Sequence, residues 1–144
     1  MDAIDRKILA LLVEDARRTL DDVGGRVGLS GPSVKRRVDR LRTDGVITGF
    51  TAVLDPALLG NQTEALIELF YAPGVLLSEV AADLARHPEV VEAWSITGEA
   101  DALARVRTTD NADLERLIRA LQADGRVERT RSQVVLSRLV TRPG

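Results

Sequence analysis

The sequence contains no cysteine and only one histidine, His87, among its 144 residues. The missing thiols exclude a disulfide framework, a cysteine nucleophile, an iron–sulfur cluster and a cysteine-rich zinc site. With a single imidazole, any histidine-based metal site or Ser-His-Asp triad must depend on His87. Aromatic residues make up only 3% of the chain, so its core must be aliphatic.

Long apolar runs are also missing. No segment approaches the ~18 apolar residues of a membrane span, and the first residues lack the small-residue cleavage site of a signal peptide. The acidic residues are scattered, without the clustering of a metal site. We therefore expect a cytoplasmic protein with no membrane partner, no metal and no cofactor. The composition, 44% apolar and 29% charged, is that of a globular protein of one or two domains.

The formal net charge of -2 hides a contrast between the two parts of the chain. Residues 1–50 hold ten basic and eight acidic side chains, whereas residues 51–144 hold ten and fourteen. Five of the basic residues lie within Ser33–Arg42, beside one acidic residue. A basic patch on a mildly acidic chain indicates a local site for a polyanion.

Hydrophobic spacing predicts helices at the start of the chain. The first is expected over about 3–13 with Asp2 as its N-cap, and the second over about 20–27 with Thr19 as its N-cap. The apolar residues of the first helix recur at helical spacing, at Ile4, Ile8, Leu11 and Leu12.

A third helix is expected from Ser30, its N-cap, to Gly45, after a tight turn at Gly28-Leu29-Ser30. Its apolar face is formed by Val34, Val38 and Leu41, and a second face carries Ser33, Arg36, Arg37 and Arg40. Three helices with a tight turn before the last one are typical of a helix-turn-helix, whose last helix enters the major groove of DNA. A solvated basic face without a DNA role is the alternative. The coincidence of cap, turn and arginine row favours DNA binding.

From Val46 the hydrophobic period shifts toward the alternation of strands. A strand is expected over 46–54, followed by a turn at Asp55-Pro56. The remaining segments follow in the order strand, helix, strand, strand, helix, strand, at about 64–71, 76–87, 90–97, 102–108, a helix capped by Asp110, and 128–140. This order is that of the ferredoxin-like βαββαβ fold, so the fold class is α+β.

Several short motifs, taken together and in this order, resemble the Lrp/AsnC regulators, the feast/famine regulators of bacteria and archaea. The resemblance extends over essentially the whole chain. The motifs of the first part are Asp5-Arg6-Lys7-Ile8-Leu9, Val27-Gly28-Leu29-Ser30, Val34-Lys35-Arg36-Arg37-Val38, Gly45-Val46-Ile47 and Leu54-Asp55-Pro56. Those of the second part are His87-Pro88-Glu89-Val90-Val91 and Thr97-Gly98-Glu99-Ala100-Asp101.

The resemblance implies a winged-helix-like helix-turn-helix domain over 1–45, a connector strand and linker over 46–60, and a ferredoxin-like effector and oligomerisation domain over 61–144. It implies a transcriptional regulator, not an enzyme, in which connector strands pair within a homodimer and dimers assemble to octamers or higher. Double-stranded DNA is expected to contact Ser30, Ser33, Lys35, Arg36, Arg37 and Arg40. An effector, an amino acid or a related small metabolite, is expected between dimers, at Thr97, Gly98, Glu99, Ala100 and Asp101.

The expected effector site also has a chemical rationale. A glycine-containing turn exposes backbone N–H groups that can hold a carboxylate, and Asp101 suits an α-ammonium; the alternative is an ordinary hairpin turn. Many relatives have aromatic residues where this chain has Ala100 and Ala102. We interpret these alanines as a pocket for an effector larger than glycine or alanine. The opposite interpretation is a pocket too bare to hold any ligand.

Two substitutions follow from these patterns. Gly24 stands inside the second helix where relatives often have alanine, so Gly24→Ala is predicted to raise thermal stability and leave DNA affinity unchanged. Arg37→Ala is predicted to weaken DNA binding by about 1–3 kcal/mol if Arg37 reads a base. The loss should be equal on all sequences if Arg37 contacts phosphate.

Two other interpretations of the chain remain open. One is a DNA-architectural protein that needs no effector. Another is an enzyme, because siroheme decarboxylases resemble Lrp/AsnC proteins in architecture; that chemistry uses histidines, and His87 is explained by a helix end. Trp94 is expected to pack in a core or an interface.

Overall fold

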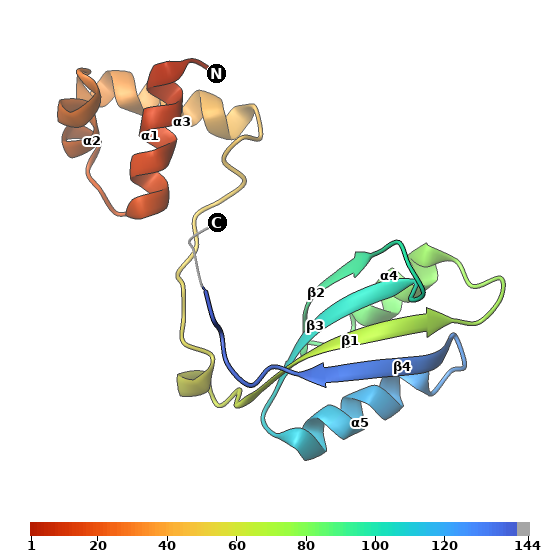
Figure 1. Cartoon of the computed structure of the whole chain (residues 1–144). Helices are drawn as coiled ribbons and strands as arrows, with labels where there is room; N and C mark the ends of the chain where they lie inside the picture. The colour runs from red at the N-terminus through yellow and green to blue at the C-terminus, as the bar shows by residue number, and fades with distance from the viewer. Residues whose placement is uncertain (141–144) are drawn as a thin grey trace. The chain divides into compact units, whose positions relative to one another are not determined.

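The computed structural model describes residues 1–140 of the 144-residue chain. These residues form two compact units, residues 1–53 and residues 54–139. The first unit is helical, and the second combines a four-stranded sheet with helices (Figure 1). Each unit has its own apolar core, which confirms the α+β class predicted from the sequence.

The three helices of the first unit are α1 (Ala3–Glu14), α2 (Leu20–Val27) and α3 (Gly31–Thr43). Their apolar faces meet at a core centred on Ile8, Val23 and Val34. The two predicted N-caps are confirmed. The Asp2 carboxylate accepts the backbone N–H of Asp5, and the Thr19 hydroxyl accepts that of Asp22, which satisfies one free N–H in each first turn.

The third helix begins and ends where the sequence predicted, but its first turn differs from the expectation. Ser30 occupies the N-cap position of α3 without capping it, since its Oγ donates to Ser33 Oγ at 3.0 Å. At the other end, Gly45 adopts a left-handed conformation with φ 71°. The chain leaves the helix there, as expected for a glycine at this position.

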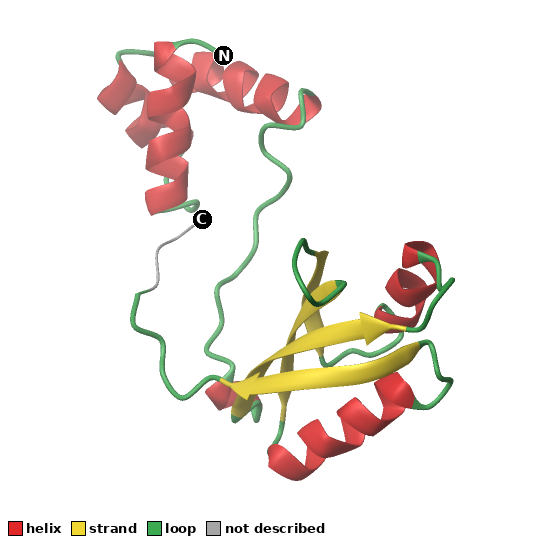
Figure 2. Ribbon diagram, turned by 45° about the vertical axis from the view of Figure 1, so that its right-hand side comes forward, coloured by secondary structure: helices red, strands yellow, loops and turns green. Residues whose placement is uncertain are grey.

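The strand expected over 46–54 is absent from the part of the chain that the structure describes. Residues 48–55 form a loop (Figure 2). A strand needs a neighbour to share its backbone hydrogen bonds, and no segment within residues 1–140 pairs with this one. Its apolar side chains are therefore exposed, among them Phe50, Val53 and Leu54.

The second unit begins with a short 3-10 helix, Ala57–Leu59. Its four antiparallel strands lie in the order β2-β3-β1-β4. The strands are β1 (Thr63–Tyr71), β2 (Val90–Ser95), β3 (Ala102–Thr108) and β4 (Val127–Val134), and the helices are α4 (Leu77–Leu84) and α5 (Asn111–Gln122). The predicted ferredoxin-like order is confirmed. The helix expected over 76–87 is shorter, and the last strand ends at Val134 rather than at 140.

Both helices of the second unit pack against one face of the sheet (Figure 2). Alternation along β1 places Ala65, Ile67 and Leu69 on that face, where they are fully buried. The opposite face carries no helix within residues 54–139. Within residues 1–140 we find no helix that could span a membrane.

Candidate DNA-binding surface and effector turn

The structure brings most of the predicted DNA-binding residues together on one face of α3. A surface hollow of about 380 Å³ is lined by Leu29, Ser33, Arg36, Arg37 and Arg40. We call this the arginine hollow. Its guanidinium groups suit base edges or phosphates of a polyanion.

Two predicted DNA-binding residues lie beside the arginine hollow, not in its lining. Lys35 faces a neighbouring side of α3, where its Nζ lies 2.6 Å from the Asp39 carboxylate. Ser30 is exposed, and its hydroxyl reaches the hollow only through Ser33. The polar lining of the hollow therefore consists of Ser33 and the three arginines.

Two acidic residues of α1 also belong to this surface, and the sequence interpretation missed their role. Arg37 Nη1 lies 2.7 Å from Asp2 Oδ2 and 2.8 Å from Asp5 Oδ1. Arg40 Nη2 lies 2.9 Å from Asp5 Oδ2. A signal was present: Asp5 shares a helical face with the buried Ile8, three residues later, so an inward carboxylate was to be expected.

The same contacts shift the pKa values of the two carboxyl groups and of the Arg37 guanidinium. The backbone N–H of Asp5, and then Arg37, lower the pKa of Asp2 to about 2. The backbone N–H of Asp2 and the Arg37 guanidinium likewise lower the pKa of Asp5. The two carboxylates raise the pKa of Arg37. All three groups are held in their charged forms.

Acid should therefore weaken the first unit. A carboxyl group whose pKa is lower in the folded protein than in the unfolded chain stabilises the fold at every pH above its unfolded pKa, which is near 3.8 for Asp2. Asp2 loses this contribution as the pH falls toward its folded pKa of about 2. We expect Asp2→Asn to lower the melting temperature at pH 6 by more than at pH 2.5, measured by calorimetry. Glu128→Gln, an exposed acid of β4, serves as the charge-matched control. A deficit that stays constant with pH would contradict the assignment.

Arg36 differs from its neighbours on α3. Its side chain is exposed, and its one hydrogen bond within residues 1–140 is Nη2 to Ser33 Oγ at 3.3 Å. No carboxylate of the described chain forms an ion pair with it. Its guanidinium can therefore bind a phosphate or a guanine edge without breaking an internal pair.

The predicted effector residues form the turn between β2 and β3. Gly98 has φ 128°, a conformation that favours glycine. Asp101 is tied to the sheet: its Oδ2 accepts the backbone N–H of Tyr71 at 2.8 Å, and its own N–H donates to the Leu69 carbonyl at 3.0 Å. Asp101 thus anchors the turn at the end of β1. Its other carboxylate oxygen has no hydrogen bond within residues 1–140.

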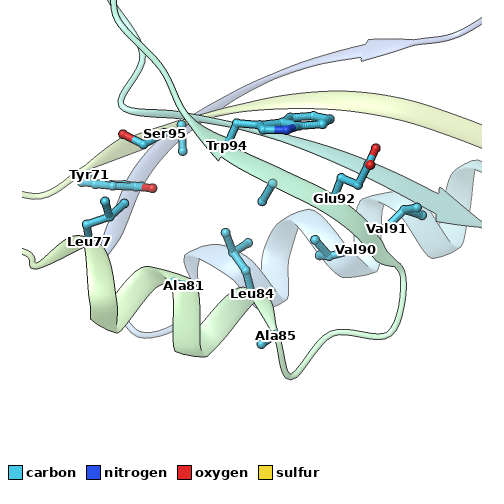
Figure 3. A pocket seen from close by; sticks show the side chains of 12 residues that line it. Tyr71, Leu77, Ala81, Leu84, Ala85, Val90, Val91, Glu92, Trp94 and Ser95 are labelled. Atoms are coloured by element: carbon cyan, nitrogen blue, oxygen red, sulfur yellow. The ribbon is translucent and has the colours of Figure 1, made fainter. Parts of the chain in front are cut away.

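An apolar cavity of about 410 Å³ begins where this turn ends (Figure 3). Ser95 and Ala102, the last residue of β2 and the first of β3, both line it. It continues between β2 and α4, past Tyr71 and Leu84. Burial, and then the nearby carboxylate of Asp101, raise the pKa of the Tyr71 phenol, which stays neutral at pH 7.

The two alanines that flank Asp101 are not equivalent. Both are buried, with exposed fractions of 5% for Ala100 and 2% for Ala102. Only Ala102 lines the cavity. A large side chain at residue 102 would fill this space, so its alanine leaves room that an aromatic residue would remove.

Trp94 and His87, two further residues of interest in the sequence, lie outside the turn. Trp94 lies on edge strand β2 beside the cavity and is 44% exposed, so it is not a core residue; its ring lies on the side of the strand away from α4 (Figure 3). His87 follows α4, and its N–H donates to the Leu84 carbonyl at 3.1 Å. Within residues 1–140 no group of three His, Asp or Glu side chains is placed to hold a metal.

Two family models match the chain. The AsnC-type helix-turn-helix domain matches residues 1–42, and the Lrp/AsnC ligand binding domain matches residues 64–144. The first match contains the arginine hollow, and the second contains the turn and the cavity.

Whole-length relatives agree with these matches. The HTH-type transcriptional regulator Rv2324 of Mycobacterium tuberculosis is 42% identical over 142 residues, covering 99% of this chain and 96% of that protein. The AsnC family transcriptional regulator from Agrobacterium tumefaciens has a TM-score of 0.92 at 28% identity, over 100% of this chain and 95% of that one. The feast or famine regulatory protein Rv3291c from M. tuberculosis, complexed with L-methionine, has a TM-score of 0.91 at 31% identity, over 97% and 95%.

Proposed function

Because the chain belongs to the Lrp/AsnC family of transcriptional regulators, we propose that it binds DNA through the arginine hollow and responds to an amino acid at the turn. The observation that carries the DNA contact is the hollow itself, where Ser33 and three arginines of α3 converge. Within that set, Arg36 has no internal ion pair among the described residues. A role on DNA is also the reason to propose a cytoplasmic location.

Selection from a random pool of duplexes identifies the DNA site without a known operator. The 144-residue chain is used to select the duplexes, and the enriched site is then footprinted. A two-fold symmetric dimer predicts two half-sites about 34–36 Å apart, or a multiple of that spacing, in a roughly palindromic site. If no duplex is enriched above an unrelated sequence, sequence-specific binding is refuted and the architectural alternative is favoured.

We propose an amino acid larger than alanine as the effector. The turn offers a carboxylate oxygen of Asp101 that has no hydrogen bond among the described residues and suits an α-ammonium, and the adjoining cavity of about 410 Å³ offers apolar walls for a side chain. A relative of 31% identity was solved with L-methionine, an amino acid of this kind. L-Methionine is therefore the first ligand to test, followed by the branched and aromatic amino acids.

L-Methionine or a similar amino acid should raise the melting temperature of the second unit. A ligand that binds only the folded state, at about 100 times its dissociation constant, stabilises by roughly 2.7 kcal/mol. A thermal-shift series of the twenty amino acids at millimolar concentration measures this effect. Asp101→Asn keeps an oxygen for the Tyr71 N–H and removes the charge, so we expect it to abolish the shift while the fold persists.

Two results would contradict this assignment. Selective binding of glycine or alanine alone would exclude the larger effector, and an undiminished shift in Asp101→Asn would exclude the turn. Glu128→Gln removes a carboxylate elsewhere in the same unit and should leave the shift unchanged. If no amino acid gives a shift, amino-acid sensing is refuted, and either a related metabolite that is not an amino acid or a regulator without an effector is favoured.

We also propose a homodimer that assembles further, to octamers or higher. The sheet face opposite α4 and α5 holds Leu66, Leu103 and Trp94, and it is not covered within residues 54–139. The loop of residues 48–55 pairs with no strand within residues 1–140 and exposes Val53, with 96% of its surface accessible. Both features suit contact with a second copy, in which the connector forms the strand that it lacks in a single chain. Sedimentation velocity measures the assembly, and a monomer at micromolar concentration would refute it.

A further inference from the structure

The arginines of α3 are not equivalent, because α1 supplies carboxylates to some of them. Arg37 is more enclosed than Arg40: 24% of its side chain is exposed, compared with 53% for Arg40. One of its nitrogens, Nη1, binds both Asp2 and Asp5, at 2.7 and 2.8 Å. A single guanidinium thus connects the first turn of α1 to the middle of α3.

Asp5 is the centre of this connection. Its side chain is fully buried, and both of its carboxylate oxygens are occupied. Oδ1 accepts from Arg37, while Oδ2 accepts from the Asp2 N–H and from Arg40 Nη2, each at 2.9 Å. A buried carboxylate that loses its cationic partner is strongly unfavourable. Arg37 therefore cannot turn to DNA without leaving Asp5 incompletely paired.

We propose that Arg37 is a positioning residue, which fixes the angle between α1 and α3 and orients Arg40, and that the direct DNA contact belongs to Arg36. The inference rests on the proposed function, since it concerns which arginine touches the DNA. It distinguishes Arg37, which is paired with Asp2 and Asp5, from Arg36, which is paired with neither.

Asp2→Asn tests this division with little risk to the fold. Asparagine is as good an N-cap as aspartate, so α1 keeps its cap while Arg37 loses one of its two carboxylates. For a positioning role we expect a two- to threefold weaker affinity for the selected duplex, with the salt slope of the wild type. If Arg37 contacts DNA directly, the same change removes a competing negative charge and should tighten binding on every sequence.

Arg37→Gln, Asp5→Asn and their combination form the second test. For a positioning role, Arg37→Gln weakens binding to the selected duplex by about tenfold and leaves the slope of log K against log salt unchanged. The double variant has the same net charge as the wild type. It should bind DNA no more weakly than Arg37→Gln alone, because both variants lose the same Arg37–Asp5 contact. A slope shallower by about one in Arg37→Gln would assign it a phosphate contact and overturn the proposal.

The order of the measurements separates this inference from the proposed function. All variants are compared below their melting temperatures, which are measured in the same buffer. A wild-type protein that selects no duplex refutes specific DNA binding itself. A wild-type protein that does select one, together with tighter binding by Asp2→Asn, overturns only the positioning role of Arg37.

Discussion

Arg36→Ala should weaken binding to a selected duplex by about five- to 150-fold, equivalent to about 1–3 kcal/mol, if Arg36 reads a base. The side chain is exposed in the arginine hollow and has no carboxylate partner in residues 1–140, so its removal leaves the fold unchanged. Alanine and arginine are also both good helix formers. Fluorescence anisotropy over a range of salt concentrations measures the affinity.

The salt dependence distinguishes the two possible contacts of Arg36. Loss of a base contact reduces the preference for the selected duplex and keeps the slope of log K against log salt. Loss of a phosphate contact weakens binding on all sequences and makes the slope shallower by about one. Arg119→Ala, on α5 in the second unit, removes the same charge from an exposed pair with Glu115 and serves as the control. Wild-type affinity in Arg36→Ala would remove this residue from the interface.

Gly24→Ala should lower the free energy of unfolding of the first unit by about 1–3 kcal/mol, as overpacking does in other cores. The sequence predicted the opposite, a gain in stability, but the close approach of the backbone at this residue reverses that expectation. A Cβ at residue 24 would lie 2.4 Å from the carbonyl oxygen of Leu29, which belongs to the turn between α2 and α3. The turn cannot move away freely, because the Leu29 N–H donates to the Gly24 carbonyl at 2.9 Å.

The neighbouring glycine provides a matched control. A Cβ at Gly25 would meet no atom within 4 Å, and the residue is exposed on the same helix. Gly25→Ala should therefore raise the stability by about 0.5–1 kcal/mol, the ordinary gain in helix propensity. Calorimetry of the two variants should show melting shifts of opposite sign. Stabilisation by Gly24→Ala would mean that the turn relaxes more easily than this packing allows.

The sequence by itself determined the two units and the order of the helices and strands within them. Apolar residues at helical spacing and alternating positions decided which segments became helices and strands, because burial of those side chains is the main driving force. Local caps such as Asp2, Thr19 and Asp110 placed helix starts, because each needs only contacts within a single turn. The position of the arginine row on α3 followed from the same periodicity.

The tertiary structure decided what depends on residues distant in the sequence. Asp5 lies 32 positions before Arg37, and only folding brings the two together and separates Arg37 from Arg36. Gly24 has no room for a Cβ, because the turn at Leu29 lies directly against it. Helix propensity does not account for that contact. Residues 46–54 have the alternating pattern of a strand, yet a strand also requires a partner, which residues 1–140 do not supply. Local sequence patterns specify whether a segment is helical or extended. Strand pairing, backbone contacts such as that at Gly24 and the partner of each charged side chain depend on residues that only folding brings close.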